Sequence, residues 1–154
     1  MFDLGRTLLA SVERSPRALA IVDGSLRLTY AQWLERIERV AGGLGTLGLR
    51  RGDHLVTVLQ NRWETATLHW ACQLLGIVIT PLNWRATGDE IDYCATDADA
   101  RAIAYEGVTA AAVREAKQAG LLRRIFVGEA PAAAGAHPFE TLLAADRHRS
   151  GPLA

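Results

Sequence analysis

"GIVITPLNWR", residues 76–85, is the stretch that decides the fold class. Its run of four β-branched residues predicts a buried strand, and strands that are apolar throughout belong inside parallel sheets covered by helices on both faces. Pro81 has no backbone N–H, so we expect the hydrogen bonding of the strand to end there. The residues that follow, Asn83, Trp84 and Arg85, mark either a binding site at the carboxyl end of the strand or a turn with a polar cap.

The same pattern, a short apolar run, recurs along the chain. Short apolar runs lie near residues 56, 78, 103 and 126. Between them, helical segments are expected at residues 62–75, 88–96 and 109–119. A repeat of roughly 22 to 25 residues is typical of compact β-α units. The sequence therefore predicts a doubly wound α/β fold, with a mostly parallel sheet and helices on both faces.

A β-hairpin and a long helix are expected before this sheet. Residues 18–30 predict the hairpin, with Asp23-Gly24 as its two-residue turn. Thr29 and Gln32 have the spacing of a capping box, so the helix is expected to begin after Thr29 and to end near Gly48. Its apolar residues recur with a period close to 3.6 and are Trp33, Ile37, Val40, Leu44 and Leu47.

Two further helix starts are expected from the same spacing. Asn61 lies three residues before Glu64, and Thr87 lies three residues before Glu90. Asn and Thr are both good N-cap residues, so each pair predicts a capped helix.

The chain is expected to divide at residue 127. Residues 1–127 form the predicted N-terminal α/β subdomain, and residues 128–154 are predicted to be a linker and a short helix that lead to a missing remainder. Residues 128–138 are rich in Ala, Gly and Pro, as linkers are, and "PFETLLAADRHR", residues 138–149, predicts the short helix.

Composition excludes several classes of protein. The chain has 154 residues, 49% of them hydrophobic, and a formal net charge of zero, which argues against a nucleic-acid partner. Charges at Arg6, Glu13 and Arg14 interrupt the N-terminus, unlike a signal peptide, and no apolar run approaches the ~18 residues of a membrane span. We expect a cytoplasmic protein, with Cys72 and Cys94 as reduced, packed thiols.

Two short motifs have structural interpretations. Residues 43–48 match GxGxxG, but they lie at the end of a predicted helix, whereas a dinucleotide fingerprint opens one. These glycines therefore predict close helix packing and a C-cap. Arg51-Gly52-Asp53 is expected to be a turn in which the Asp53 carboxylate accepts backbone N–H groups.

No metal site is expected. Asp89 and Glu90 fall in the first turn of a helix, where the dipole stabilises negative charge. The other members of this acidic cluster are Asp92, Asp97 and Asp99. The four histidines have no metal-ligand spacing: His54, His69, His137 and His148.

An apolar stripe on the helix at 62–75 is expected to pack in the core. Its residues are Trp63, Ala66, Trp70 and Leu74. Leu68, Ala71 and Leu75 make the helix apolar on a further side, so we expect an exposed apolar face that drives self-association.

Catalytic motifs are missing. No serine sits in GxSxG, and no glycine-rich loop ends in lysine to hold phosphates. The only lysine, Lys117, is expected on a helix between Glu115 and Gln118. No residue is therefore assigned as catalytic or as cofactor-binding.

An ordered set of motifs from residue 16 to residue 127 resembles the start of the adenylate-forming superfamily, which includes acyl-CoA synthetases. The pieces are Thr29-Tyr30, Gly52-Asp53, Asn61, Gly76, Pro81-Leu82-Asn83-x-Arg85, Glu90-Ile91 and Asp97. The form of the proline motif resembles the acyl-CoA and aryl-CoA synthetase branch. Departures are Ile77, where the family usually has Ala, and Ala86, where Leu is usual.

The resemblance implies an ATP-dependent acid–CoA ligase of fatty acid metabolism. Such an enzyme joins a carboxylate to AMP and then passes the acyl group to the thiol of coenzyme A. ATP, Mg²⁺ and CoA would serve the complete enzyme, and none is expected for this chain alone, because the family's catalytic motifs lie further along. The resemblance also implies a partner: the remainder of the ligase, or a second copy bound through an apolar face.

The role of "PLNWR" stays open between two interpretations. The resemblance places it at the exit of an inner strand, where Asn83, Trp84 and Arg85 would support substrate binding. We favour the turn, in which Arg85 would pair with the helix start at Asp89 and Glu90. For the whole chain, the alternatives to a ligase fragment are a non-catalytic module that binds a protein partner and an unrelated nucleotide-binding module.

Overall fold

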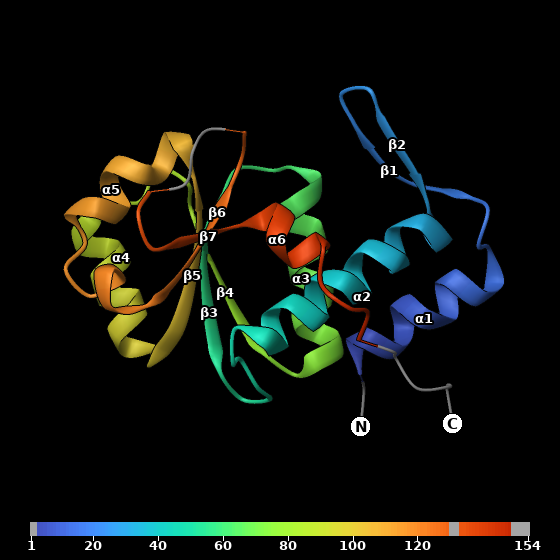
Figure 1. Ribbon diagram of the computed structural model, residues 1–154, viewed down its shortest axis with the longest axis horizontal. Helices are drawn as coiled ribbons and strands as arrows, with labels where there is room; N and C mark the ends of the chain where they lie inside the picture. The colour runs from blue at the N-terminus through green and yellow to red at the C-terminus, as the bar shows by residue number, and fades with distance from the viewer. Residues whose placement is uncertain (1–2, 130–132, 149–154) are drawn as a thin grey trace.

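The computed structural model describes residues 3–129 and 133–148, and these form a five-stranded parallel sheet with helices around it (Figure 1). The strand order is β4-β3-β5-β6-β7. The bounds are β3 His54–Val58, β4 Val78–Leu82, β5 Ala100–Glu106, β6 Arg123–Val127 and β7 Ala136–Pro138. The chain runs from β3 outward to β4 and then returns to the other side of β3 for β5. This reversal confirms the predicted doubly wound sheet.

Helices cover both faces of the sheet. On one face lie α4 and α5, and on the other lie α2, α3 and α6, with α1 outside them (Figure 1). Their bounds are α1 Leu4–Arg14, α2 Tyr30–Thr46, α3 Trp63–Leu75, α4 Gly88–Asp97, α5 Ala110–Glu115 and α6 Phe139–Leu143. Alternate residues of each inner strand belong to two hydrophobic cores, one on each face of the sheet. Leu55 and Ala102 lie in the core on the α3 side, whereas Val56 and Ile103 lie in the core on the α4 side.

The strand within residues 76–85 is β4, and it lies at the edge of the sheet. Within the described residues, β4 pairs only with β3, and Val78 is 44% exposed. The prediction of a buried inner strand that ends at Pro81 is therefore wrong, because pairing continues through Pro81 to Leu82. The N–H of Val78 points toward β3 and donates to the carbonyl of Asp53 at 2.9 Å. By alternation, the nitrogen of Pro81 faces the outer edge, where no hydrogen bond is lost.

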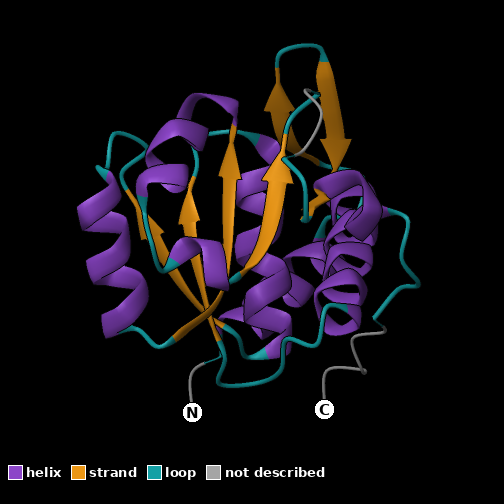
Figure 2. Ribbon diagram, turned by 60° about the vertical axis from the view of Figure 1, so that its left-hand side comes forward, coloured by secondary structure: helices purple, strands orange, loops and turns teal. Residues whose placement is uncertain are grey.

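The β1–β2 hairpin stands apart from the sheet, as Figure 2 shows. Its strands are β1 Leu19–Asp23 and β2 Leu26–Thr29. Asp23 pairs with Leu26, so the turn residues are Gly24 and Ser25, one position later than predicted. Gly24 has φ +55°, the left-handed conformation that the first position of such a turn requires.

The predicted capping box at the start of α2 is confirmed. The hydroxyl of Thr29 accepts the N–H of Gln32 at 3.3 Å, and the side chain of Gln32 accepts the N–H of Thr29 at 2.9 Å. Thr87 and Glu90 form the same box at the start of α4, also as predicted. Both caps are made by residues within one turn, which is why sequence spacing finds them.

The start of α3 differs from its prediction. Asn61 does not cap the helix: the N-cap is Arg62, which makes no side-chain cap bond. Instead, the carboxylate of Asp23, from the hairpin, accepts the N–H of Trp63 at 2.9 Å. Glu64 pairs with Arg62 rather than with the backbone. A side chain from a distant segment thus satisfies the orphan donor that a local cap would satisfy.

The helix expected at 109–119 is shorter. It consists of the 3₁₀ turn η1 (Gly107–Thr109), α5, and a second 3₁₀ turn η2 (Ala119–Leu121). Lys117 lies between α5 and η2, not on a helix as predicted. The carboxylate of Asp92 on α4 accepts the backbone N–H groups of Lys117 and Gln118 at 2.7 and 2.8 Å. These bonds compete with continued helix and hold the bend.

The expected linker contains structure of its own. Residues 136–138 form β7, parallel to β6, which corrects the linker assignment there, and the short helix predicted after it is present as α6. Phe139 and Leu142 are fully or almost fully buried, at 0% and 2% exposed. Residues 130–132 and 149–154 lie outside the described part of the chain, and the division at residue 127 stays a prediction.

The apolar sides of α3 are covered within the chain. Trp63, Trp70 and the rest of the predicted stripe are half-buried against the core. Leu68 and Ala71 are 0% exposed, so the prediction of an exposed apolar face at these residues is wrong. The reason is that α3 packs between the sheet and α1 and α2, which cover its second side.

The glycine motif of α2 is a packing contact and a C-cap, as predicted. A Cβ on Gly43 would lie 2.6 Å from the Cα of Leu142 on α6. Gly48 has φ +84° just after the helix end and closes it with a bond from its N–H to the carbonyl of Gly45. The turn at Gly52 is also as predicted, with Asp53 accepting the N–H of Arg50 at 2.7 Å.

We expect Gly43→Ala to lower the free energy of unfolding by about 1–3 kcal/mol, because the new methyl group meets the α6 backbone. Gly45→Ala is the matched control in the same helix, since its Cβ would meet nothing within 4 Å. The control should be neutral or stabilising by up to about 1 kcal/mol. Urea denaturation of both variants checks this, and equal effects would contradict the close α2–α6 contact.

We expect Asp23→Ala to destabilise the chain by ~1 kcal/mol, because Trp63 loses its hydrogen-bond acceptor at the start of α3. Asn61→Ala should change the stability little, since Asn61 is exposed and makes no cap. Denaturant melts followed by circular dichroism compare the two. The reverse ranking would restore Asn61 as the cap.

Candidate functional site

The candidate site lies where β3 and β5 end side by side. From β3 the chain turns to α3 on one face of the sheet, and from β5 it turns to α5 on the other face. In open α/β sheets, ligands bind in the crevice at such a topological switch point, outside the carboxyl ends of the strands. Which side chains occupy this crevice therefore decides what the fold can do.

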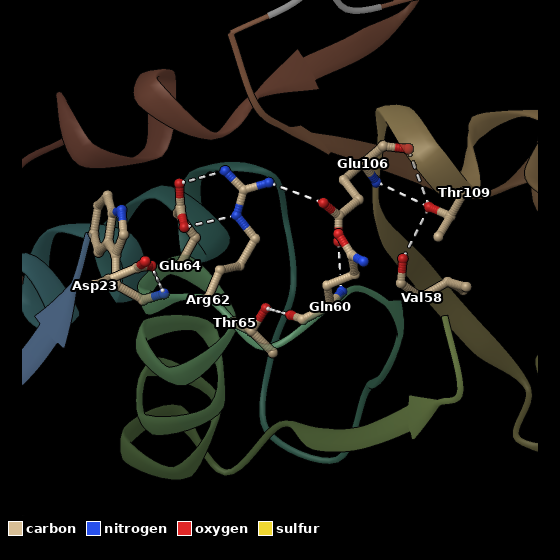
Figure 3. Close-up of polar contacts among 9 residues, drawn as sticks. Asp23, Val58, Gln60, Arg62, Glu64, Thr65, Glu106 and Thr109 are labelled. Carbon is tan, nitrogen blue, oxygen red and sulfur yellow. Dashed lines mark hydrogen bonds and ion pairs between the residues drawn. The ribbon is translucent and has the colours of Figure 1, made fainter. Parts of the chain in front are cut away.

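A cluster of polar side chains lies at the carboxyl ends of β3 and β5 (Figure 3). Arg62, from the loop after β3, donates from Nε and Nη2 to the carboxylate of Glu64 at 2.9 and 3.0 Å. Its Nη1 donates to Oε2 of Glu106, at the end of β5, at 3.0 Å. The other oxygen of Glu106 accepts the backbone N–H of Gln60. We call Gln60, Arg62, Glu64 and Glu106 the switch-point cluster.

Thr109 closes the cluster on the β5 side. Its hydroxyl accepts the backbone N–H of Glu106 at 3.1 Å and donates to the carbonyl of Val58, the last residue of β3, at 2.9 Å. Thr109 is 1% exposed. The ends of both strands are therefore joined through Arg62, through the backbone N–H of Gln60 and through this hydroxyl.

Burial makes the charges of the cluster depend on one another. Glu64 and Glu106 are 8% and 5% exposed, and a carboxylate so far from water needs a cation or several donors nearby. The hydrogen bond to Glu64 raises the pKa of Arg62 above its usual value; partial burial acts in the opposite direction, and the contact with Glu106 adds to the rise. Arg62 therefore stays charged, and it gives its N–H groups to the chain's own carboxylates.

The "PLNWR" segment forms a turn beside a second feature, a cleft of about 550 Å³ between the end of β4 and α4. Asn83 Oδ1 accepts the N–H of Arg85 at 2.9 Å, and the Asn83 carbonyl accepts the N–H of Ala86 at 2.9 Å. This is the polar-capped turn that the sequence favoured. The lining of the cleft is Leu82, Asn83, Arg85, Ala86, Asp89, Glu90, Tyr93 and Cys94.

The structure places the three predicted substrate-binding residues in two groups. Asn83 and Arg85 line the cleft, and Trp84 does not. The guanidinium of Arg85 stacks 3.9 Å from the ring centre of Trp84. Among the described residues Arg85 makes no ion pair with Asp89 or Glu90, so that expectation is wrong; Glu90 is used by the capping box instead. Whether these residues bind substrate stays a prediction.

The switch-point cluster was not predicted from the sequence. One signal was available: Glu106 is a charged residue directly after an apolar strand, and Arg62 follows the previous inner strand closely. The pairing of Arg62 with Glu106 depends on β5 lying next to β3, on the side opposite β4. Strand order is not written in the local sequence.

The described residues hold no arrangement suited to Mg²⁺, which prefers several oxygen ligands. Both cysteines are free; burial raises the pKa of the Cys72 thiol to about 12, and Cys94 is half-buried. No helix in residues 3–129 or 133–148 combines the length and apolar character needed to cross a membrane.

Comparison with known proteins gives the family. The family described as "AMP-binding enzyme" matches residues 8–148. The chain is 34% identical over 130 residues to a feruloyl-CoA synthase from Amycolatopsis, covering 84% of this chain and 26% of that protein. It is 31% identical over 121 residues to the long-chain-fatty-acid–CoA ligase FadD13 of Mycobacterium tuberculosis, covering 77% of this chain and 24% of that protein. The chain belongs to the AMP-binding enzyme family.

A solved structure shows the same fold. A benzoate CoA ligase from Burkholderia xenovorans LB400 superposes with a TM-score of 0.83 and 22% identity, covering 100% of this chain and 31% of that one. The chain thus spans about a quarter of the length of the curated relatives above. The resemblance drawn from the ordered motifs is confirmed, and the chain matches the N-terminal part of such ligases.

We expect Arg62→Met to lower the free energy of unfolding by about 2–3 kcal/mol, because two buried carboxylates lose their cation. The value is below that of a fully buried pair, since the Arg62 side chain is 28% exposed. Arg101→Met is the control: its contact with Asp99 is 3.9 Å long and exposed, and should contribute almost nothing. Equal stability of the two variants in guanidinium melts would show that the switch-point cluster does not stabilise the contact between the ends of β3 and β5.

Proposed function

We propose that this chain is the N-terminal segment of an ATP-dependent acid–CoA ligase. In the proposed reaction a carboxylate oxygen attacks the α-phosphorus of ATP, which forms an acyl-adenylate and releases pyrophosphate. The sulfur of the coenzyme A thiol then attacks the acyl carbon, and AMP leaves. ATP and coenzyme A are substrates of the complete enzyme, with Mg²⁺ as the ion that accompanies ATP.

The observation that carries the proposal is the family match over residues 8–148 together with the names of the relatives. The feruloyl-CoA synthase, the long-chain-fatty-acid–CoA ligase and the benzoate CoA ligase all act on different acids. What their names share is the joining of an acid to coenzyme A, so the proposal names that reaction class and leaves the acid open.

We infer that the chain by itself is a structural part of the ligase and does not catalyse. Adenylation requires fixed N–H donors, a metal ion and a cation around the phosphates. The sequence has no glycine-rich loop ending in lysine. The GxGxxG match lies at the end of α2, where Gly43 packs against α6, and does not open a helix. Lys117, its only lysine, lies in the bend held by Asp92.

The switch-point cluster supports a structural contribution to the same reaction. Open α/β sheets place ligands outside the carboxyl ends of their strands. Arg62 and Glu106 fix the ends of β3 and β5 relative to each other at that edge. We propose that the remainder of the ligase packs near this edge and supplies the groups that contact ATP.

The test is carboxylate-dependent exchange of labelled pyrophosphate into ATP, with a panel of benzoate, ferulate and long-chain fatty acids. We expect no exchange above background with the purified chain. Exchange should appear when the polypeptide encoded directly after Ala154 is added, and that polypeptide alone is the control.

Two outcomes would contradict the proposal in different ways. Exchange by the chain alone would show that it holds its own adenylation machinery. No exchange with any acid, once both polypeptides are folded and mixed, would contradict the ligase assignment itself.

A further inference from the structure

The cleft beside α4 carries a protruding aromatic ring at its rim. Tyr93, on α4, is 70% exposed, although it lines the cleft together with Leu82, Ala86 and Cys94. The tyrosine and the adjoining cleft of about 550 Å³ are therefore both accessible to a partner. Tyrosine is enriched among the residues that dominate protein interfaces, because it buries a large rigid ring and keeps a polar end.

Charged side chains of both signs line the same cleft: Arg85, Asp89 and Glu90. The carboxylate of Glu90 is engaged in the capping box with Thr87. Arg85 stacks on Trp84, and within residues 3–129 and 133–148 it makes no ion pair. The carboxylate of Asp89, one α4 turn before Tyr93, has no hydrogen-bond or ion-pair partner in that part of the chain. Arg85 and Asp89 therefore give the cleft a cation and a carboxylate that are open to a partner, beside an aromatic ring and the capping carboxylate of Glu90.

We propose that this patch binds a second copy of the chain about a twofold axis. A twofold interface brings the same surface of each subunit together, so a patch must be complementary to itself. Here the Tyr93 ring of one copy enters the cleft of the other, and Arg85 of each copy pairs with Asp89 of its partner. The contact takes Arg85 as an interface residue rather than as a ligand for a substrate.

The edge strand argues for contact through side chains. β4 ends at this cleft, and an exposed edge strand often binds another strand through its free N–H groups. The nitrogen of Pro81 faces that outer edge and carries no hydrogen, so extension of the sheet across β4 is blocked near the cleft. The second copy therefore docks on Tyr93 and the cleft, and not as an added strand.

The first experiment measures the mass of the purified chain by sedimentation equilibrium over a wide concentration range. We expect a concentration-dependent rise from 16.7 kDa toward twice that mass. Tyr93→Ala should leave the fold intact, because the ring is mostly exposed, and should weaken the dimer at least roughly tenfold. A chain that stays monomeric at every concentration, or a dimer unchanged by Tyr93→Ala, would overturn the proposal.

The second experiment tests the charge pairing between copies. Arg85→Glu alone brings two carboxylates together at each Arg85–Asp89 contact, and Asp89→Arg alone brings two guanidinium groups together there. Each variant should therefore dimerise roughly tenfold more weakly. When the two variants are mixed, each contact again joins opposite charges. We therefore expect the mixture to form a heterodimer with close to the original affinity.

Glu13→Arg is the control, because Glu13 is an exposed residue of α1, at the opposite end of the molecule from α4 (Figure 1). It should not affect the mass. Circular dichroism confirms that every variant is folded. Folded single variants that do not regain the dimer on mixing would refute the pairing of Arg85 with Asp89 across a twofold axis, and this outcome is independent of whether the chain belongs to an active ligase.

Discussion

The buried carboxylate of Glu106 is the interaction on which the arrangement of the sheet edge depends. It ends β5 at 5% exposure and accepts bonds from Gln60 and Arg62, both in the loop that leaves β3. A charge removed from water to this degree is tolerated only when it is paired and hydrogen-bonded. The loop after β3 must therefore stay against the end of β5.

From that point the constraint extends to the N-terminal hairpin. Arg62, held by Glu106, is also the N-cap residue of α3, so the start of the helix is placed by the same ion pair. The next residue, Trp63, gives its N–H to Asp23 of the hairpin. A continuous series of polar contacts thus connects β5, the loop after β3, α3 and the hairpin. Such connected groups contribute more together than separately, because each holds the next in place.

The two faces of the sheet use different means of packing. On the α3 side, Ala102 and Ala104 keep the surface of β5 flat, and Gly43 lets α6 approach α2 closely. On the α4 side, Ile103, Tyr105 and Phe126 fill the space beneath shorter helices. The longer helices lie on the first of these faces, where α1 and α2 pack against α3. On the second face a cleft stays open where α4 meets the end of β4.

What the sequence determined by itself was local. The capping boxes at Thr29 and Thr87, the C-cap at Gly48 and the alternation of apolar strands with helices all act within a few residues, so their spacing was enough to predict the doubly wound fold. The family came from the resemblance of the ordered motifs. The tertiary structure decided that β4 is an edge strand, that Asp23 caps a helix 40 residues away, and that Arg62 lies between Glu64 and Glu106. Each of these depends on which strands become neighbours, and that choice is made by the packing of the whole core rather than by any segment of it.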